Sequence, residues 1–237
     1  MTRQVEVRVL GLMDYEPAWA YQTELFQQTI DTKLANRKRP PESQVPTRDH
    51  LLLCEHPHVY TLGKSGKINH LLFTDKLLQR IGATYVPINR GGDVTYHGPG
   101  QIVGYPILDL DAHFTDIHKY LRYLEEVIIR TLGHYGLEGM RSPGETGVWL
   151  DVGQPSARKI CAMGIKASRW VTMHGFALNV NTDLSYFQYI VPCGISDKAV
   201  TSLEAELGHA VSMDEVQGHL LHAFAEVFGV ELRMASV

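Results

Sequence analysis

Apolar and polar residues alternate at the start of the chain, and the spacing then becomes helical. Val5, Val7 and Val9 are each separated by one residue, and this period of two predicts a short strand. After Asp14, a candidate N-cap, apolar side chains recur at helical spacing and predict a long helix. Its apolar positions include Trp19, Phe26, Ile30 and Leu34. The polar stretch 38–49 contains three prolines and predicts a loop.

Short apolar runs in the middle of the chain predict further strands. They lie at 50–56, 58–63, 84–90, 94–97, 101–110 and 147–151. Thr74 is a candidate cap for one helix, and Asp116 for a second, strongly amphipathic helix that Gly133 and Gly136 are expected to end. Strands outnumber helices and do not alternate with them strictly. The pattern therefore predicts an α+β class with a mixed β-sheet and flanking helices.

The C-terminal third is predicted to hold two strands followed by two helices. Between residues 158 and 180 the period is again near two, and Gly175 interrupts it, which predicts two strands meeting at a bend or bulge. Thr201 and Ser212 are each followed three residues later by a glutamate. This spacing fits the capping box and predicts two helix N-termini.

Composition narrows the class of protein. A chain of 237 residues with 44% hydrophobic residues can bury one sizeable core, so we expect one domain, residues 1–237. The net charge of −4 argues against general nucleic-acid binding. Three cysteines in no metal or disulfide spacing favour a reducing compartment. The charged N-terminus and the lack of a long apolar run predict neither a signal peptide nor a membrane span, and hence a cytoplasmic location.

The segment 90–101, R-G-G-D-V-T-Y-H-G-P-G-Q, holds four glycines. Glycines at this density suit either a close approach of the backbone to a ligand or a plain hairpin. His97 is accordingly either a structural histidine or a group that faces a ligand. The segment is not a dinucleotide fingerprint, and Gly63-Lys64-Ser65 lacks the earlier glycine of a phosphate loop. The pair His56 and His58 has no third ligand in register, so no metal site is predicted.

Cys193 lies between Pro192 and Gly194, a setting that leaves room for backbone N–H groups to approach whatever the sulfur attacks. The competing interpretation is a small buried hydrophobic side chain. A second feature lies nearby. Between Asp151 and Asp183 the chain has no acidic residue, and this stretch is either a solvated strand face or a surface for an anionic partner. Its cations are Arg158, Lys159, Lys166 and Arg169.

Three segments together resemble the lipoyl(octanoyl) transferase family. They are residues 90–106, 158–166 and 174–195, and the similarity spans roughly residues 50–207. The resemblance implies the fold of lipoate and biotin protein ligases and no cofactor. It implies transfer of an octanoyl group from acyl carrier protein to a lysine of lipoyl domains, those of 2-oxoacid dehydrogenase complexes or of the glycine cleavage H protein.

The resemblance also assigns residues. It implies that Cys193 carries the acyl thioester and that Lys159 assists it. Its substrate-binding segments correspond to Arg90, Gly91, Gly92, Asp93, Val94, Thr95, Tyr96, His97, Ala162, Met163, Gly164, Gly175, Phe176 and Ala177. Cys161 stands where a small residue such as alanine is expected.

These assignments are chemically coherent. A cysteine nucleophile divides acyl transfer into thioester exchange and aminolysis, and neither step needs ATP. The Lys159 ammonium would lower the pKa of the thiol, and its amine would later take a proton from the incoming amine. N–H groups around Gly194 or in the 162–164 segment are candidates for an oxyanion hole. An apolar trench for the C8 chain is expected from Val94, Tyr96, Met163 and Phe176.

Three other functions fit parts of the same pattern. An ATP-dependent lipoate or biotin ligase would share the fold and a lysine, but would need an adenylate site. A non-catalytic acyl-binding module would bind octanoyl groups without a covalent adduct. A cysteine hydrolase would need a histidine partner, and none stands in a recognisable motif.

Overall fold

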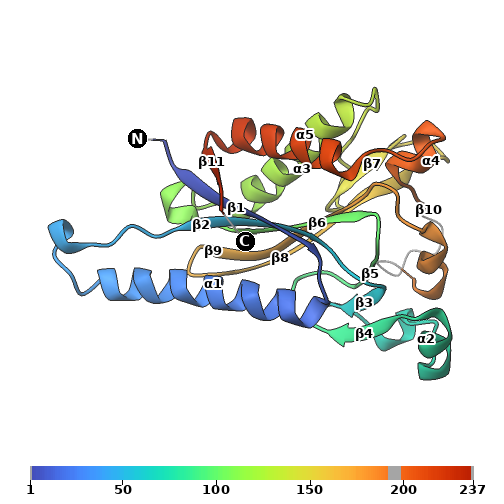
Figure 1. The fold of residues 1–237 in the computed structure, drawn as a ribbon, viewed down its shortest axis with the longest axis horizontal. Coiled ribbons are helices and arrows are strands. Elements are labelled where there is room, and N and C mark those ends of the chain that lie inside the picture. Colours follow the sequence, from blue (N-terminus) through green and yellow to red (C-terminus); the bar gives the residue numbers. More distant parts are fainter. Residues whose placement is uncertain (1, 192–198, 236–237) are drawn as a thin grey trace.

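The computed structural model describes residues 2–191 and 199–235, and it has the predicted α+β class with a mixed sheet (Figure 1). The strands of the large sheet are β1 (Gln4–Leu12), β2 (Asp49–Glu55), β6 (Gln101–Ile107), β7 (Val148–Leu150), β8 (Arg158–Ser168), β9 (Val171–Asn179), β10 (Ala199–Val200) and β11 (Glu231–Met234). Those of the small sheet are β3 (Val59–Leu62), β4 (Thr84–Pro87) and β5 (Val94–His97). The helices are α1 (Tyr15–Asn36), α2 (Asp75–Ile81), α3 (Ile117–Gly133), α4 (Leu203–Leu207) and α5 (Met213–Phe228).

The large sheet has the order β10-β8-β9-β6-β2-β1-β11, with β7 paired beside β8, and the small sheet has the order β4-β3-β5. Strands β2, β6, β9 and β8 pair antiparallel in that order, whereas β1 runs parallel to both β2 and β11. Figure 1 shows α1 along one face of the large sheet and α3 with α5 along the other.

Strand β2 shows why the large sheet is covered on both faces. Its side chains alternate, so Leu51 and Leu53 join the core formed with α3 and α5, while Leu52 and Cys54 join the core beneath α1. All four are buried. Full burial of each leucine contributes about 1.5–3 kcal/mol to stability, so both layers depend on this one strand.

Three of the predicted helix caps are confirmed. The Thr74, Asp116 and Ser212 side chains each accept a hydrogen bond from a backbone N–H of the first helical turn. The predicted cap at Thr201 is wrong by one residue, because the Ser202 hydroxyl accepts from Ala205 N instead. Asp14 stands at the start of α1 but makes no side-chain cap hydrogen bond.

The predicted bend at Gly175 is also wrong. Strands β8 and β9 form one hairpin whose turn lies at Arg169 and Trp170, with φ of 51° and 62°. Positive φ at both central residues matches the twist of a two-residue hairpin. Gly175 lies inside β9, where a Cβ atom would come 2.2 Å from the carbonyl oxygen of Gly104 on β6. Glycine therefore permits close approach of two strands here rather than a bend.

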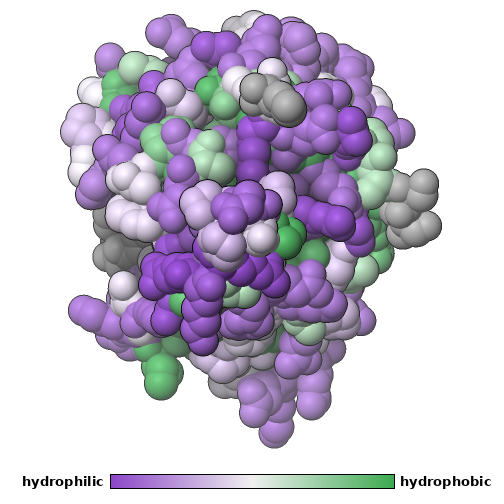
Figure 2. All heavy atoms as spheres, turned by 90° about the vertical axis from the view of Figure 1, so that its left-hand side faces the viewer, coloured by the Kyte–Doolittle hydropathy of each residue, from purple (hydrophilic) through white to green (hydrophobic). Residues whose placement is uncertain are grey.

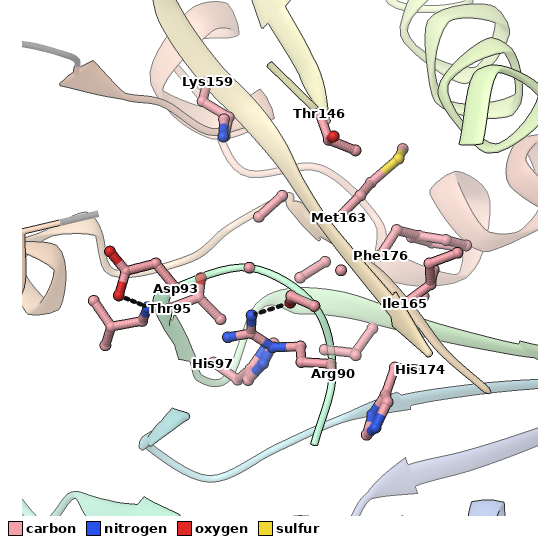
Figure 3. Close-up of a pocket in the computed structure, with 18 of the residues that line it drawn as sticks. Arg90, Asp93, Thr95, His97, Thr146, Lys159, Met163, Ile165, His174 and Phe176 are labelled. Atoms are coloured by element: carbon pink, nitrogen blue, oxygen red, sulfur yellow. Dashed lines mark hydrogen bonds between the residues drawn. The ribbon is translucent and has the colours of Figure 1, made fainter. Parts of the chain in front are cut away.

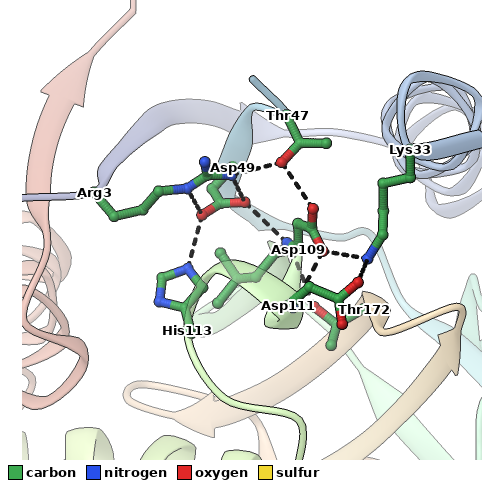
Figure 4. Close-up of polar contacts among 9 residues, drawn as sticks. Arg3, Lys33, Thr47, Asp49, Asp109, Asp111, His113 and Thr172 are labelled. Carbon is green, nitrogen blue, oxygen red and sulfur yellow. Dashed lines mark hydrogen bonds and ion pairs between the residues drawn. The ribbon is translucent and has the colours of Figure 1, made fainter. Parts of the chain in front are cut away.

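The C-terminal end of α1 is tied to the sheet by paired charges, which we call the charged cluster (Figure 4). Its members are Arg3, Lys33, Thr47, Asp49, Asp109, Asp111 and His113. Arg3 Nε donates to Asp49 Oδ2 at 2.7 Å, and Lys33 pairs with Asp109. Figure 2 shows this end of the molecule from outside, where hydrophilic residues cover most of the face. The cluster thus fixes α1 and the loop 37–48 beneath a polar surface.

None of the helices in residues 2–191 and 199–235 is both long enough and apolar enough to cross a membrane.

Candidate functional site

A cavity of about 460 Å³ lies where the small sheet meets β8 and β9. Every residue of the segments 90–97, 162–164 and 175–177 lines it except Tyr96, and Lys159 lines it as well (Figure 3). The volume falls within the usual range for small-molecule sites. The structure thus brings the three segments, which are separated in the sequence, together around one cavity.

Tyr96 corrects the expected apolar trench. Along β5, Val94, Thr95 and His97 line the cavity, whereas the Tyr96 side chain packs in the core of the small sheet. There its hydroxyl lies 2.7 Å from His58 Nδ1, and its ring stacks on Tyr186 at 5.0 Å. Tyr96 therefore lies outside the cavity.

The loop 90–93 lies against β8 because glycine leaves room for it. Gly91 N donates to Ile165 O at 2.9 Å, and a Cβ atom on Gly164 would come 2.8 Å from Gly91 O. The buried Arg90 guanidinium holds the loop from beneath by donating to Thr61 O and to Gly91 O at 3.1 and 3.0 Å. Gly92 has a φ of 86°, which a larger side chain would strain. The glycine-rich segment is therefore a loop that packs closely onto a neighbouring strand at the rim of the cavity.

Lys159 stands on β8, with Nζ 4.6 Å from the centroid of the Trp149 ring. This is cation–π distance, and within the described ranges 2–191 and 199–235 Lys159 has no ion-pair partner. Cys161, two residues further along β8, is fully buried, and burial raises the pKa of its thiol. Burial likewise raises the pKa of the Cys54 thiol. Neither described thiol is therefore suited to act as a nucleophile at neutral pH.

Cys193 lies outside the described residues. The chain on both sides of it is fixed at the cavity. Phe187 lines the cavity before it, and Ala199 and Val200 line it afterwards. Val191 N donates to His70 O at 2.9 Å, and β10 pairs with the start of β8 with Val200 opposite Lys159. Phe187, before the 192–198 segment, and Ala199 and Val200, after it, thus line the same cavity as Lys159.

The four cations of the acid-free stretch do not form one basic face. Arg158 pairs with Asp151 and, at 2.5 Å, with Glu206, and these hydrogen bonds raise the pKa of Arg158. Lys166 Nζ lies 5.1 Å from the centroid of the Phe26 ring, and burial with the neighbouring Lys64 charge lowers the pKa of Lys166. Acidic residues from other parts of the chain therefore neutralise one end of the stretch.

Several lining residues were missed by the sequence analysis. They include Tyr15, Gln101, Tyr105, Trp149, His174 and Asn179. His174 is buried in β9 with a φ of 59°, a strained conformation for a residue other than glycine. Its Nε2 lies 3.0 Å from Asn89 Oδ1, and burial, with Arg90 and Lys166 nearby, lowers the pKa of His174 to about 3. A histidine and an asparagine within a largely apolar strand were the available signal.

Metal ligands are not clustered in the part of the chain that the structure describes. No group of three or more His, Cys, Asp or Glu side chains there is placed to hold an ion.

Comparison with known proteins identifies the family. The model of the lipoyl protein ligase A/B catalytic domain matches residues 14–225. The chain belongs to this family. It is 63% identical over 234 residues to an octanoyltransferase of Christiangramia forsetii, covering 98% of this chain and 99% of that protein. It is 59% identical to an octanoyltransferase of Flavobacterium johnsoniae, covering 98% and 100%. The resemblance inferred from the three segments is therefore confirmed.

The fold of the lipoyl protein ligase A/B family is also found in solved structures. A bipartite lipoate protein ligase from Thermoplasma acidophilum superposes with a TM-score of 0.71 at 18% identity, covering 100% of this chain and 88% of that one. The predicted lipoate-ligase-like fold is confirmed by this likeness.

Proposed function

We propose that this chain is an octanoyltransferase, a single catalytic domain that moves an octanoyl group from acyl carrier protein to a lysine of a lipoyl domain. The observation that carries the proposal is the 63% identity, over nearly the whole of both chains, to a protein named octanoyltransferase. The position of Lys159 at the cavity, without an ion-pair partner among the described residues, supports it.

The proposed chemistry has two steps. In the first, the Cys193 thiolate attacks the carrier thioester carbonyl, the carrier C–S bond breaks, and the carrier leaves as a thiol after taking a proton from the Lys159 ammonium, which leaves Lys159 as an amine. In the second, the amine of the acceptor lysine attacks the Cys193 thioester. The C–S bond to Cys193 breaks, an amide forms, and the proton of the amine passes to the Lys159 amine. The ammonium form of Lys159 would stabilise the Cys193 thiolate before the first step and again after the second.

The cavity supplies a suitable environment for the C8 chain. Val94, Met163 and Phe176 line it, and Phe176 packs in the same core as Met163. An apolar chain gains about 0.8 kcal/mol for each CH₂ group that it buries, so several buried methylenes would hold the acyl group firmly. Because both proposed half-reactions use the same acyl group, one apolar site serves both.

Intact mass spectrometry tests the proposal. After incubation with octanoyl-acyl carrier protein, we expect wild-type protein to gain one octanoyl group, and Cys193→Ala to gain none and to transfer none to a lipoyl domain. Cys161→Ala is the matched control, because Cys161 is a buried thiol on β8 that does not line the cavity, so its removal is expected to leave the adduct intact. Turnover in Cys193→Ala would contradict the covalent route. Pyrophosphate release on adding ATP and octanoic acid would favour a ligase instead.

Lys159 variants separate its two proposed roles. Lys159→Ala is expected to raise the pH midpoint for alkylation of Cys193 by about one to two units, because a neighbouring positive charge is lost. Lys159→Arg keeps the charge but cannot accept the proton of the amine, so alkylation should stay near wild type while transfer falls by at least about 100-fold. An unchanged alkylation midpoint and transfer rate in Lys159→Ala would rule out the paired mechanism.

A further inference from the structure

A chain of side-chain hydrogen bonds runs from the cavity to Thr201, the residue directly after β10. We call it the amide relay; its members are His97, Gln101, Asn179 and the carbonyl of Thr201. His97 Nδ1 lies 2.8 Å from Gln101 Oε1, and Gln101 Nε2 donates to Asn179 Oδ1 at 2.8 Å. Asn179 Nδ2 then donates to Thr201 O at 2.9 Å. Gln101 and Asn179 are directly opposite each other in the register of β6 and β9.

The direction of every bond in the amide relay is determined by its far end. A backbone carbonyl can only accept, so Thr201 O requires the NH₂ group of Asn179 on that side. Asn179 Oδ1 therefore faces Gln101 and accepts from Nε2, which also lies 3.3 Å from the carbonyl of Tyr96. The Gln101 oxygen is then left to face His97 and can only accept. His97 Nδ1 must therefore carry the hydrogen, and Nε2 of the neutral ring carries a lone pair.

The lone pair of His97 is at the cavity. His97, Gln101 and Asn179 are all buried and all line it, and Figure 3 shows the His97 ring among the lining side chains. His97 Nε2 forms no hydrogen bond with any residue in the described ranges, nor is it among the fully enclosed polar atoms there that lack a partner. His97 Nε2 is thus a hydrogen-bond acceptor without a donor among the described residues, whereas the other polar side-chain atoms of the amide relay are hydrogen-bonded.

The groups around His97 keep its ring neutral. The Tyr15 ring from α1 stacks on it at 5.8 Å, and the His56 ring lies edge-on at 5.8 Å. Arg90 from the loop before β5 and His174 from β9 add positive or potentially positive charge. Burial, followed by the His56 contribution, lowers the pKa of His97 to about 3, whereas the hydrogen bond to Gln101 opposes this.

We propose that Gln101 and Asn179 are positioning residues that hold His97 as its Nδ1–H tautomer, so that His97 Nε2 accepts a hydrogen bond from an N–H group of the substrate. Resting on the proposed function, we assign this N–H to the amine of the acceptor lysine. That amine must enter the site uncharged to attack a thioester, and a buried N–H without an acceptor is costly. The neutral His97 ring can accept a hydrogen bond from this N–H while remaining unprotonated itself.

The amide relay also links the two sides of the cavity. Thr201, whose carbonyl ends the relay, donates its own N–H to Lys159 O at 2.9 Å. One continuous set of hydrogen bonds therefore runs from the His97 ring to the backbone of Lys159. A substitution at Gln101 or Asn179 would therefore change the environment of His97 on one wall of the cavity. It would also change the hydrogen bonding of the Lys159 backbone on the other wall.

The tautomer is directly measurable without substrate. The ¹⁵N chemical shifts of the His97 ring distinguish a nitrogen that carries hydrogen from one that does not. We expect Nδ1 to be protonated and Nε2 unprotonated between pH 5.5 and 8.5, with no titration. A ring with hydrogen on Nε2, or one that titrates near its ordinary value, would overturn the proposal whether or not the chain transfers octanoyl groups.

Variants of Gln101 test the role in turnover. Gln101→Met keeps the volume but removes the hydrogen bonds to His97, Asn179 and the Tyr96 carbonyl, so we expect hydrogen to appear on His97 Nε2 and kcat for transfer to the lipoyl domain to fall roughly tenfold. Formation of the octanoyl adduct should change less than about twofold. Gln101→Glu keeps the acceptor for Nδ1, so hydrogen should remain there. The added charge should let the ring titrate, giving the rate a new loss at low pH.

Asn181→Ala is the matched control. The Asn181 side chain makes two backbone hydrogen bonds, to Val211 O at 2.8 Å and from Val211 N at 3.0 Å, and it has no contact with the amide relay among the bonds described. It should lower stability without altering the His97 tautomer or kcat. If Gln101→Met has no larger effect on kcat than Asn181→Ala, or leaves the hydrogen on Nδ1, the positioning role is refuted. If wild-type protein transfers no octanoyl group, the proposed function fails while the tautomer measurement still stands.

Discussion

The two ends of α1 lie beside two different sets of buried polar side chains, the charged cluster and the amide relay. Lys33, near the C-terminal end, belongs to the charged cluster, and Tyr15, at the N-terminal end, stacks on His97 of the amide relay. The two residues are separated by about 27 Å along the helix axis, at 1.5 Å per residue. The charged cluster is built from ion pairs, whereas the relay is built from neutral amides and one neutral imidazole.

This difference in charge and pairing indicates a structural role for the charged cluster and a functional role for the amide relay. In the charged cluster each acid meets a cation, and although burial opposes it, the hydrogen bonds from Arg3 and His113 keep the pKa of Asp49 below its usual value. The amide relay ends in His97 Nε2, which lies at the cavity and has no hydrogen-bond partner among the described residues. A polar atom without a partner beside a cavity suggests contact with a ligand or water, while closed pairs suggest a support.

Removing one partner from the charged cluster should have the largest effect on stability. The Asp49 side chain is fully buried, so Asp49→Ala should lower the free energy of unfolding by about 3–5 kcal/mol, measured by urea titration. The activity of the remaining folded protein should be unchanged. Arg130→Ala, which breaks an exposed pair with Glu126, should cost less than about 1 kcal/mol. If Asp49→Ala lost activity but kept its full stability, the charged cluster would not have the purely structural role that distinguishes it from the amide relay.

The two regions should also lose stability in different pH windows. His97 and His174 have a pKa near 3 in the folded protein and an ordinary value of 6.5, so the unfolded chain binds more protons between these values. Stability is therefore greatest above about pH 6.5 and falls as pH decreases, by at most about 1.4 kcal/mol per pH unit for each histidine. Asp49, with a lowered pKa, should add its loss only below about pH 4.

His174→Asn tests the histidine part of this difference, because asparagine tolerates the positive φ at that position but does not titrate in this range. The free energies of unfolding from urea titrations at about pH 7.5, 6.5, 5.5 and 4.5 should decline less steeply in the variant than in the wild type, with a difference of up to about 2.7 kcal/mol at the lowest pH. Parallel curves for the two proteins would show that folding does not lower the pKa of His174.

The smallest effect is expected from cations that belong to neither region. Charge reversal at Lys166 or Arg169 should raise KM for octanoyl-acyl carrier protein about threefold and weaken the salt dependence of the rate. The reaction with a small octanoyl thioester should be nearly unchanged. Arg158→Ala is the control, because Arg158 is already paired with Glu206 and is expected to lose stability rather than carrier affinity. Equal loss with both donors would assign Lys166 and Arg169 to the cavity or the fold.

The sequence pattern predicted elements better than it predicted how they meet. Alternation at Val5, Val7 and Val9 predicted β1, and the apolar spacing after Asp116 predicted α3, because each signal lies within one element. The hairpin turn was missed because Arg169 and Trp170 are not the residues that usually adopt positive φ. Local pattern contains no such information.

The candidate site shows the same limit. The resemblance to a family located most of the cavity wall, but Tyr96 was placed there although it packs in the core of the small sheet. The amide relay could not be predicted from the sequence, because Gln101 and Asn179 are 78 residues apart and are brought together only by the register of β6 and β9. Cys193 remains a prediction, since it lies outside the described residues.

The position of β1 next to β11 has a consequence for synthesis of the protein. Strand β1 is made long before β11, which is its partner on one side, with Gln4 opposite Glu231. Until β11 has left the ribosome, β1 presents an open row of N–H and C=O groups beside the apolar Val5 and Val7. A nascent chain, or one shortened before Glu231, therefore carries an unprotected edge that can pair with another chain.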